Sequence, residues 1–347
     1  MIQQPPFTIT VKAADYLVKI VETVTRLEYG TGFKRDMKLH RKNRVRSIHS
    51  SLAIEGNTLS LDEVTDVIEG KLVAKKQMEV KEVKNAYEAY DKIMTFDPYT
   101  VKDFLKAHKL MTDGLVKESG TFRSGDVGVF DATWWFIGAR PQFVPQLIEE
   151  LFVWAKSTEL HPVLKSAIVH CEIEIIHPFA DGNGRMGRLW QTLLLAKWKT
   201  IFAWIPMESL VYEKRPQYYE TLQNVQKNSN SGEFIEFTLF AILETLEAQA
   251  RHQARHKEKH IDEHIDKHIV EQLPDTMLAV LKALKSKNLS RNEIFAAISL
   301  NNDYRAFKRN IEPLLTDGYI EMTVPDKPSS KLQKYRLTDK GKAAIGK

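Results

Sequence analysis

The sequence predicts a mainly α-helical protein with one short β-hairpin in its helical core and a small winged helix-turn-helix unit at its carboxyl end. Three observations support this fold class. Apolar residues recur at helical spacing through most of residues 10–250. Residues 120–145 are instead rich in Gly, Pro, Val and Trp without a helical period, which indicates two short strands and a turn. Residues 274–347 contain three helical stretches followed by two strand-like runs.

Helices are expected throughout residues 10–95. Ser60 and Glu63 form the sequence signature of a capping box, which opens a short helix closed by Gly70. The next helix has four apolar or aromatic side chains at a spacing that places them on one face: Val83, Tyr87, Tyr90 and Met94.

Later helices are expected over residues 104–115, 146–156 and 163–176. A long helix over 235–270 carries five histidines four residues apart, and such pairs can chelate a transition metal. The Lys, Arg and Glu around them favour a solvated or intersubunit helix, and a four-residue period drifts around a 3.6-residue helix. These histidines are His252, His256, His260, His264 and His268.

The composition is that of a globular protein. The chain has 347 residues, 43% of them apolar and 27% charged, which is enough for two or three domains. No apolar run is long enough to cross a bilayer, and the first ten residues lack the pattern of a secretory signal. Cys171 is the only cysteine, which excludes a disulfide framework and a cysteine-based zinc site. We therefore expect a cytoplasmic protein without membrane contact.

The net charge of +5 is concentrated at the carboxyl end. Residues 274–347 hold 14 Lys and Arg against 8 Asp and Glu, so the rest of the chain is nearly neutral. In the third expected helix of this unit, Arg305, Lys308 and Arg309 are placed to meet phosphates, which suggests DNA as a partner. A solubilising surface or a protein contact would give the same pattern, so these alternatives stay open.

The strongest functional signal is HPFADGNGRMGR, from His177 to Arg188. Pro178 ends one buried helix, and the GNG turn of residues 182–184 exposes backbone N–H groups where the next helix begins. The positive end of a helix favours anions. Arg185 and Arg188 lie on one face of that first turn, where two cations are unfavourable unless anions are bound. Several phosphates would suit this arrangement.

Two further residues fit the same chemistry. Asp181 lies beside the turn, and a carboxylate next to phosphates is the usual way in which proteins hold Mg²⁺. His177 is a candidate general base, because an imidazole titrates near neutral pH. A core histidine, a surface ion pair or a capping turn would explain each residue singly, but not all of them at this spacing.

A second signal is SSLAIEGNTLS, at residues 50–60. The helix expected at about 44–56 ends near Glu55, because the following glycine and asparagine are typical of a helix stop. A carboxylate is unfavourable at the negative end of a helix. Either Glu55 is a solvated surface residue, or it has a cationic partner elsewhere in the chain.

These stretches carry a family resemblance. HPFADGNGRMGR matches in full the signature HPFx(D/E)GNGRxxR of the Fic (filamentation induced by cAMP) family, and SLAIEGN is similar to the family's inhibitory motif (S/T)xxxE(G/N). GTFRSGDVGV, HPVLKSAIVHCEIEIIHPF and RPQYYETLQ also resemble family segments. The resemblance covers roughly residues 1–250. It implies a Fic-fold core with an N-terminal inhibitory helix (class II type), to which a C-terminal winged helix is a common addition.

The resemblance implies an adenylyltransferase that moves AMP from ATP to a Ser, Thr or Tyr hydroxyl of a protein. His177 would deprotonate the hydroxyl, Asp181 would hold Mg²⁺, Arg185 would stabilise the leaving group and Arg188 would bind the γ-phosphate. The flap hairpin would align the target as an added strand through Val127, Gly128 and Val129. The implied ATP-binding residues are Asp181, Gly182, Asn183, Gly184, Arg185, Met186, Gly187, Arg188, Tyr218 and Gln226.

The resemblance also implies regulation. Glu55 would pair with Arg188, since both charges lie at unfavourable helix ends, and would keep the γ-phosphate away; Ser51 would steady this contact. UMP or phosphocholine transfer, AMP removal aided by Glu55, and a nucleotide-sensing winged-helix regulator are the alternatives. The intact His177 and Asp181 favour an enzyme over a sensor. The target protein stays open and includes the chain itself, and pairing into a homodimer is a further expectation.

With these signals, the sequence suggests four parts. They are an N-terminal helical region with the inhibitory helix (1–95), the Fic core (96–235), a linker helix (236–272) and the winged helix domain (273–347).

Overall fold

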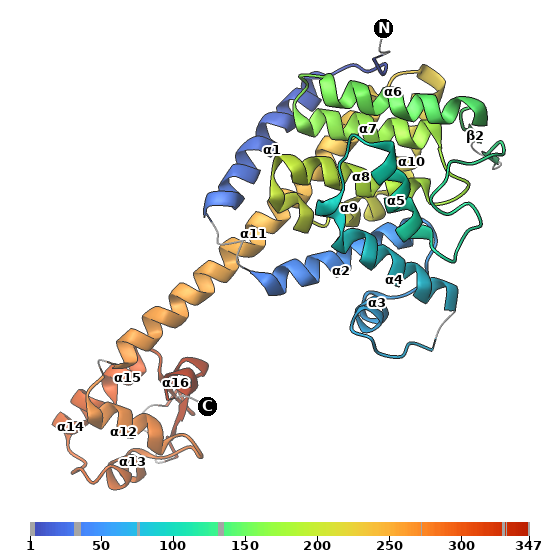
Figure 1. The fold of residues 1–347 in the computed structure, drawn as a ribbon. Coiled ribbons are helices and arrows are strands. Elements are labelled where there is room, and N and C mark those ends of the chain that lie inside the picture. Colours follow the sequence, from blue (N-terminus) through green and yellow to red (C-terminus); the bar gives the residue numbers. More distant parts are fainter. Residues whose placement is uncertain are drawn as a thin grey trace. The chain divides into compact units, whose positions relative to one another are not determined.

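The computed structural model describes residues 4–30, 36–74, 77–130, 135–271, 273–327, 330 and 332–345. Within these ranges it does not describe the side chains of residues 129, 130, 135, 136, 254–271 and 343. The described chain is mainly helical with two short hairpins, as the sequence predicts (Figure 1). None of the described helices is long and apolar enough to cross a membrane.

The chain forms two compact units, Met1–Ala254 and Arg255–Lys347, each with its own apolar core. The finer division into four parts stays a prediction. The first unit contains α1 (Val11–Gly30), α2 (Met37–Ile54), α3 (Leu61–Ile68), α4 (Gln77–Asp91), η2 (Ile93–Thr95), α5 (Val101–Thr112), β1 (Gly128–Phe130), β2 (Trp135–Ile137), η3 (Pro141–Phe143), α6 (Val144–Ser157), α7 (Pro162–Ile176), α8 (Asn183–Trp198), η4 (Thr200–Trp204), α9 (Met207–Glu213) and α10 (Arg215–Asn228).

Helices α7 and α8 pack against each other in the core of the first unit. Both are buried on nearly all sides, so their apolar residues follow no single stripe. Trp190 of α8 lies edge-on to Phe104 of α5 with 4.9 Å between ring centroids, and Phe104 contacts Phe179 at 5.1 Å. This aromatic cluster anchors the connection between α7 and α8, which holds the predicted site.

The predicted N-terminal helix is present as α2, although it begins earlier than residue 44. Asp36 caps it by accepting a hydrogen bond from the backbone N–H of Leu39 at 2.9 Å. Gly56 ends it with φ +94°, a left-handed conformation that favours glycine. Most of its second half is buried, including Ser51, so α2 is a core helix rather than a surface one.

The face predicted for the helix around residue 87 is only half right. Val83 and Tyr90 are buried in α4, whereas Tyr87 and Met94 are each 39% exposed. Met94 lies beyond the end of α4, in the 3₁₀ turn η2, where a 3.6-residue spacing no longer applies.

The predicted flap is the antiparallel hairpin of β1 and β2, in which Val129 lies opposite Phe136. The backbone N–H of Gly138 donates to the carbonyl of Val127 at 3.2 Å and continues the pairing beyond β2. Residues 131–134, between β1 and β2 in the sequence, lie outside the described residues.

The long helix is present as α11 (Gly232–Glu271). The side chains of four of its five histidines lie outside the described ones, so their solvated or intersubunit role stays a prediction. These four are His256, His260, His264 and His268.

The second unit contains α12 (Asp275–Ala283), α13 (Arg291–Ala297), α14 (Tyr304–Asn310), α15 (Glu312–Thr316), β3 (Ile320–Met322), β4 (Tyr335–Leu337) and α16 (Asp339–Ala344). The single third helix predicted here is wrong, because α14 and α15 replace it. Pro313 lies in the first turn of α15, the part of a helix that tolerates proline. Leu289 bridges to Tyr335 beside the pair of β3 and β4. This order is compatible with a winged helix, an assignment that stays a prediction.

Candidate active site

The site is built around the loop between α7 and α8. His177 precedes a proline, which disfavours a helical conformation, and it ends α7 with φ +54°. Gly182 has φ +88°, and α8 begins directly after it. The buried side chain of Asn183 accepts a hydrogen bond from the backbone N–H of Phe179 and donates one to its carbonyl, both at 2.8 Å. Asn183 therefore fixes the loop from inside.

His177 is oriented as a base. Its Nδ1 lies 3.2 Å from the carbonyl oxygen of Glu174, which can only accept, so Nδ1 carries the proton and Nε2 keeps its lone pair. Burial lowers the pKa of His177 below its ordinary value, although Glu174 partly opposes this shift. The imidazole is consequently neutral at pH 7.

Sequence reasoning missed Arg123, which ties the flap to this base. Its guanidinium donates to the backbone carbonyls of His177 and Gly125, at 2.7 Å each, and to that of Ala139. The backbone N–H of Arg123 donates to the carbonyl of Pro178 at 3.0 Å. The sequence offered no signal for this role, because an arginine in an irregular segment resembles a surface arginine.

Sequence reasoning also missed His108, on α5. Its Nδ1 accepts a hydrogen bond from the backbone N–H of Gly120, so Nε2 carries the proton and donates to the carbonyl of Asp181, both at 3.0 Å. The ring stacks on Phe179 with 3.6 Å between centroids, and burial lowers its pKa to about 4. A neutral His108 therefore supports the loop between α7 and α8 through its contacts with Phe179 and Asp181. Its only sequence signal was a histidine within an amphipathic stretch.

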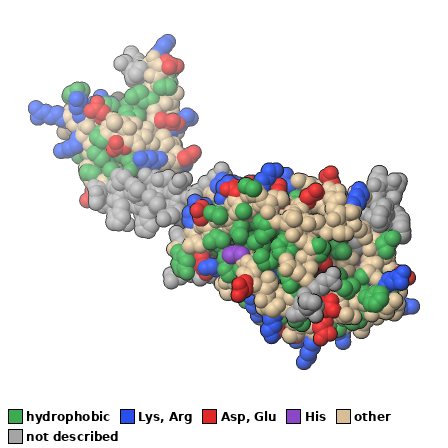
Figure 2. Space-filling model, turned by 90° about the horizontal axis from the view of Figure 1, so that it is seen from above, with side chains coloured by type: hydrophobic (Ala, Val, Ile, Leu, Met, Phe, Trp, Pro, Cys, Tyr) green, Lys and Arg blue, Asp and Glu red, His purple; other side chains and the backbone are tan. Residues whose placement is uncertain are grey.

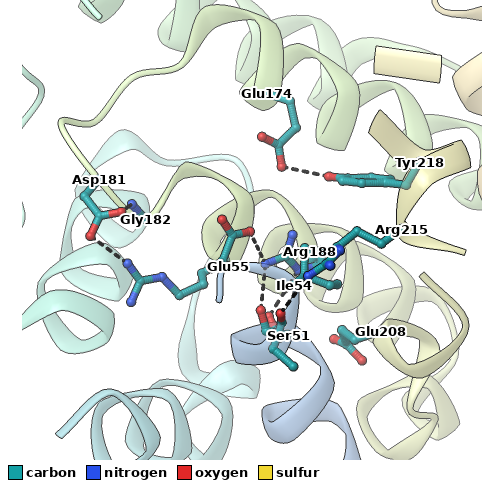
Figure 3. A network of polar contacts seen from close by, with 12 residues as sticks. Ser51, Ile54, Glu55, Glu174, Asp181, Gly182, Arg188, Glu208, Arg215 and Tyr218 are labelled. Atoms are coloured by element: carbon teal, nitrogen blue, oxygen red, sulfur yellow. Dashed lines mark hydrogen bonds and ion pairs between the residues drawn. The ribbon is translucent and has the colours of Figure 1, made fainter. Parts of the chain in front are cut away.

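The two arginines of the signature are buried and paired with carboxylates. Arg185 donates to Asp181 at 2.9 Å, and its Nη1 lies 3.7 Å from a carboxylate oxygen of Glu82. Arg188 donates from Nη2 to Glu55 at 2.6 Å (Figure 3). The contact predicted between Glu55 and Arg188 is thus present. Burial disfavours the charge of Arg188, but Glu55, Tyr218 and Glu174 together outweigh burial and raise the pKa of Arg188.

The last carbonyls of α2 explain why a carboxylate is tolerated after them. The carbonyl of Ser51 accepts from Arg188 Nη2 at 3.0 Å, and that of Ala53 accepts from Arg215 at 3.3 Å. Cations at the carboxyl end of a helix are favourable. Arg188 also donates from Nε to the Ser51 hydroxyl at 3.1 Å. Cations at the carboxyl end of α2 therefore offset the unfavourable interaction between the Glu55 carboxylate and this helix end.

Both arginines keep buried donors that lack a hydrogen-bond partner among the described residues. They are Nη1 of Arg188 together with Nε and Nη1 of Arg185. A buried donor without a partner is costly, so these atoms call for an acceptor that the protein does not itself supply. Phosphate oxygens are suitable acceptors for guanidinium groups.

A cavity of about 400 Å³ opens over the loop. Tyr218, at its wall, is buried and donates to the carboxylate of Glu174 at 3.0 Å. Gln226, predicted to face the nucleoside, donates from its amide to the carbonyl of Ile137 at 2.9 Å and so holds the flap. The cavity is lined by Glu55, Glu174, His177, Ala180, Asp181, Gly182, Asn183, Gly184, Tyr218, Tyr219, Leu222, Gln223 and Gln226.

Glu55 lines this cavity next to Gly184. A Cβ at position 184 would collide with Oε1 of Glu55 and would lie 3.0 Å from Nη1 of Arg188. A side chain at position 184 would therefore have to displace the carboxylate of Glu55. The backbone of Gly184 could approach an anion at the same place that the Glu55 carboxylate takes.

Asp181 fits the predicted role of a Mg²⁺ ligand. Its side chain is 57% exposed, and its Oδ1 accepts from the backbone N–H of Gly182 at 2.6 Å. The described residues contain no group of three His, Cys, Asp or Glu side chains arranged around a metal. Mg²⁺ often uses one protein carboxylate with waters and phosphate oxygens, so a single carboxylate beside the unpartnered guanidinium donors suits it.

The fold and the site together define a helical protein with two buried arginines at the start of α8, and with a neutral histidine and a carboxylate that line one cavity. The sequence pattern of the Fic/DOC family matches residues 98–195. The pattern described as "Filamentation induced by cAMP protein Fic-like, C-terminal domain" matches residues 275–338.

A solved structure of a Fic family protein from Desulfovibrio desulfuricans G20 is 37% identical, with a TM-score of 0.70, and the alignment covers 98% of this chain and 100% of that one. The chain therefore belongs to the Fic family. Residues 134–508 of Fic-1 from Caenorhabditis elegans share the fold, with a TM-score of 0.57 at 21% identity over 71% of this chain and 73% of that chain.

Curated relatives include a protein adenylyltransferase Fic from Nematostella vectensis, 29% identical over 58% of this chain and 47% of the relative. Another is protein adenylyltransferase fic-1 from Caenorhabditis elegans, 26% identical over 56% of this chain and 39% of the relative. The chain thus spans less than half the length of these relatives.

Proposed function

We propose that this protein is a self-inhibited protein adenylyltransferase, which transfers AMP from ATP to a Ser, Thr or Tyr hydroxyl of a protein. The observation that carries the proposal is the set of buried guanidinium donors on Arg185 and Arg188 that lack a hydrogen-bond partner among the described residues, on the helix that follows the loop of the neutral His177. A polyphosphate would supply the missing acceptors, and the histidine would supply the base. The names of the curated relatives support the same reaction.

In the proposed reaction, His177 removes the proton of the target hydroxyl through Nε2. That oxygen forms a bond to the α-phosphorus, the bond to the bridging oxygen of the β-phosphate breaks, and pyrophosphate leaves. Arg185 stabilises the charge that develops on the leaving group, and Arg188 binds the γ-phosphate. Asp181 would hold Mg²⁺, which neutralises phosphate charge when bound. The flap at residues 127–129 would align the target segment as an added strand.

Self-inhibition is proposed from the position of Glu55. Its carboxylate pairs with Arg188 and lies against Gly184, so it takes the place and the cation that a γ-phosphate would need. Release of Glu55 would make both Arg188 and the space next to Gly184 available to the γ-phosphate. Transfer of UMP or phosphocholine uses the same groups and remains an outcome of the test. So does a role as a nucleotide-sensing regulator without transfer. AMP removal would need Glu55, so loss of label from an AMP-labelled protein incubated with the parent chain would reveal it.

The test is incubation of Glu55→Gly with a protein mixture and labelled ATP, UTP or CDP-choline. We expect protein labelling from ATP, at least tenfold above the parent chain, since a charged hydrogen bond of about 1.5–3 kcal/mol is removed from the inhibited state. Adding His177→Ala should abolish the labelling while ATP binding persists. Labelling from another donor would replace the proposal with that transfer, and labelling from none would favour the sensor.

A contact with DNA is a second proposal, for the second unit alone. Arg305, Lys308 and Arg309 are exposed on α14, and Tyr304 beside them is 67% exposed. Lys and Arg side chains project from this unit with acidic groups among them (Figure 2). Mobility shifts with duplex DNA should weaken steeply with salt and should be lost in an Arg305→Glu, Arg309→Glu variant. Absence of any shift at low salt would leave a protein contact or a solubilising surface.

Two further expectations accompany the enzyme proposal. A cytoplasmic location is proposed because Cys171, the single cysteine, is buried as a thiol. Pairing into a homodimer is proposed from the family resemblance, and its test is the mass of the protein in solution by light scattering.

A further inference from the structure

The segment that follows Glu55 is tied to α4 through the side chain of Asn57. The amide of Asn57 donates to Oε2 of Glu82 at 2.7 Å and to the backbone carbonyl of Glu79 at 3.2 Å. Its own oxygen accepts from the backbone N–H of Leu59 at 3.1 Å, so the group that faces α4 is the donating nitrogen. Every polar group of this side chain therefore has a partner, and the shortest of its hydrogen bonds goes to a carboxylate.

The carboxylate of Glu82 also faces the predicted phosphate site. Its Oε1 lies 3.7 Å from Nη1 of Arg185, whereas Asp181 accepts from Nη2 of the same arginine at 2.9 Å. A distance of 3.7 Å is too long for a hydrogen bond, but two charges at this distance attract each other, and the Arg185 side chain is only 3% exposed. Glu82 thus compensates the charge of Arg185 and leaves Nη1 available to another acceptor.

The end of the inhibitory helix is thereby connected to both arginines of the signature. Glu55 pairs with Arg188 at 2.6 Å. Two residues later in the chain, Asn57 reaches Arg185 through Glu82. A polyphosphate bound to Arg185 would bring negative charge towards Glu82, and the repulsion would weaken the hydrogen bond between Glu82 and Asn57. A ligand at one arginine can therefore affect the inhibitory contact at the other.

We propose that Glu82 is a positioning residue of the inhibited state, which through Asn57 holds the segment after Glu55 in place. Binding of phosphate to Arg185 and release of Glu55 from Arg188 are then coupled, and each favours the other. ATP would thus weaken its own inhibitor from the Arg185 side. The inference rests on the proposed adenylyl transfer and adds two residues to its regulation.

The test is Asn57→Asp, made in the parent chain and in Glu55→Gly, with labelled AMP transfer measured over a range of ATP concentrations at about pH 8. The substitution keeps the oxygen that accepts from Leu59, but it removes the donor and places a second carboxylate against Glu82. In the parent chain we expect kcat/KM to rise about tenfold, as for one lost hydrogen bond to a charged group, mainly through a lower KM for ATP. In Glu55→Gly the inhibited pairing is already absent, so no rise is expected.

Two further variants separate this role from a general loosening of the segment. Thr58 donates to the carboxylate of Glu79 at 3.1 Å, so Thr58→Val removes a hydrogen bond to the same helix without changing Glu82, and it should leave transfer unchanged. Glu82→Gln keeps an oxygen that accepts from Asn57 but loses the charge, so its rise should be smaller than that of Asn57→Asp. Thermal unfolding of each variant shows whether the fold is retained, and Glu82→Gln decides the test where Asn57→Asp does not fold.

An unchanged kcat/KM of Asn57→Asp in the parent chain would overturn the proposal, and so would an equal rise in Thr58→Val. The same change in both backgrounds would also overturn it, because the effect would then not depend on Glu55. A Glu55→Gly protein that transfers nothing would instead refute the proposed function. In that case ATP affinity still tests the inference by calorimetric titration: tighter binding by Asn57→Asp than by the parent chain supports it, and equal or weaker binding refutes it.

Discussion

One backbone carbonyl determines which nitrogen of His177 carries the proton. This leads to a specific expectation for the pH dependence of AMP transfer. Nδ1 donates to Glu174, so the base acts through Nε2, and burial lowers its pKa below 6.5. We expect transfer by Glu55→Gly to be level above pH 7 and to fall at lower pH, as the imidazole gains a proton. Glu55 raises this pKa, so its removal moves the fall to still lower pH.

Initial rates of labelled AMP transfer between about pH 5 and pH 8 would measure this profile. A kcat/KM that still increases with pH above about 7.5 would contradict a neutral His177 and would point to another base.

The side chain of Asn183 holds the loop by hydrogen bonds to both the backbone N–H and the backbone carbonyl of Phe179. In Asn183→Ala the buried N–H and carbonyl of Phe179 lose their partner, so we expect about 2–3 kcal/mol less free energy of unfolding and no transfer. Asn310→Ala is the matched control, because Asn310 is equally buried and bonds Ala306 in the second unit. It should lower stability without changing transfer. Urea unfolding and labelled transfer measure both effects, and an undiminished stability of Asn183→Ala would contradict the rigid loop.

At the scale of elements, α7 carries two carboxylates with opposite shifts. Burial opposes ionisation of Glu174, but its hydrogen bond with His170 and the nearby Arg188 outweigh burial and lower its pKa. Glu172, two residues earlier, has no such compensation, and burial raises its pKa to about 7. The side of the helix on which a carboxylate lies thus decides its charge.

This difference predicts a pH-dependent stability. Glu172 binds its proton more tightly when folded, so its contribution is present below about pH 4.5 and is lost as pH rises through about 7. The free energy of unfolding of Glu172→Gln should equal that of the parent chain near pH 5. At pH 8 it should be larger than that of the parent chain by on the order of 1–2 kcal/mol. Urea unfolding at the two pH values measures the difference. The same difference at both values would refute the assignment to this carboxylate.

The elements also show how far the sequence predicts the site. The loop after α7 and the contact between Glu55 and Arg188 were predictable, because a charge at the wrong helix end needs a partner. Arg123 and His108 were not, since their partners are backbone carbonyls brought near by the tertiary fold. A carbonyl has no residue type, so such contacts leave no pattern in the sequence.

The helix boundaries predicted from the sequence are wrong in two places for a similar reason. Periodicity placed Met94 on the buried face of α4, but the helix ends before it, and the side chain is 39% exposed. The apolar spacing also predicts a single helix that continues through Pro313, whereas a separate helix, α15, begins there. In both cases the apolar spacing is the same on either side of the break, so periodicity alone cannot locate the break.

At the scale of the whole molecule, the main apolar cores of the two units have no described residue in common. Every group that we place in the adenylyl transfer site lies in the first unit, Met1–Ala254. A ligand that binds only the folded form of one unit stabilises that unit by RT ln(1 + [L]/Kd), which is about 2.7 kcal/mol at a hundredfold excess over Kd.

ATP with Mg²⁺ should therefore shift one of two thermal transitions of the full chain. We expect this in Glu55→Gly, where Arg188 is available, and much less in the parent chain. Ile294→Val removes a buried methyl from the second core and should lower only the other transition, which assigns the two. Differential scanning calorimetry of the full chain measures both. A single transition that moves as a whole with ATP would show that the two cores unfold together.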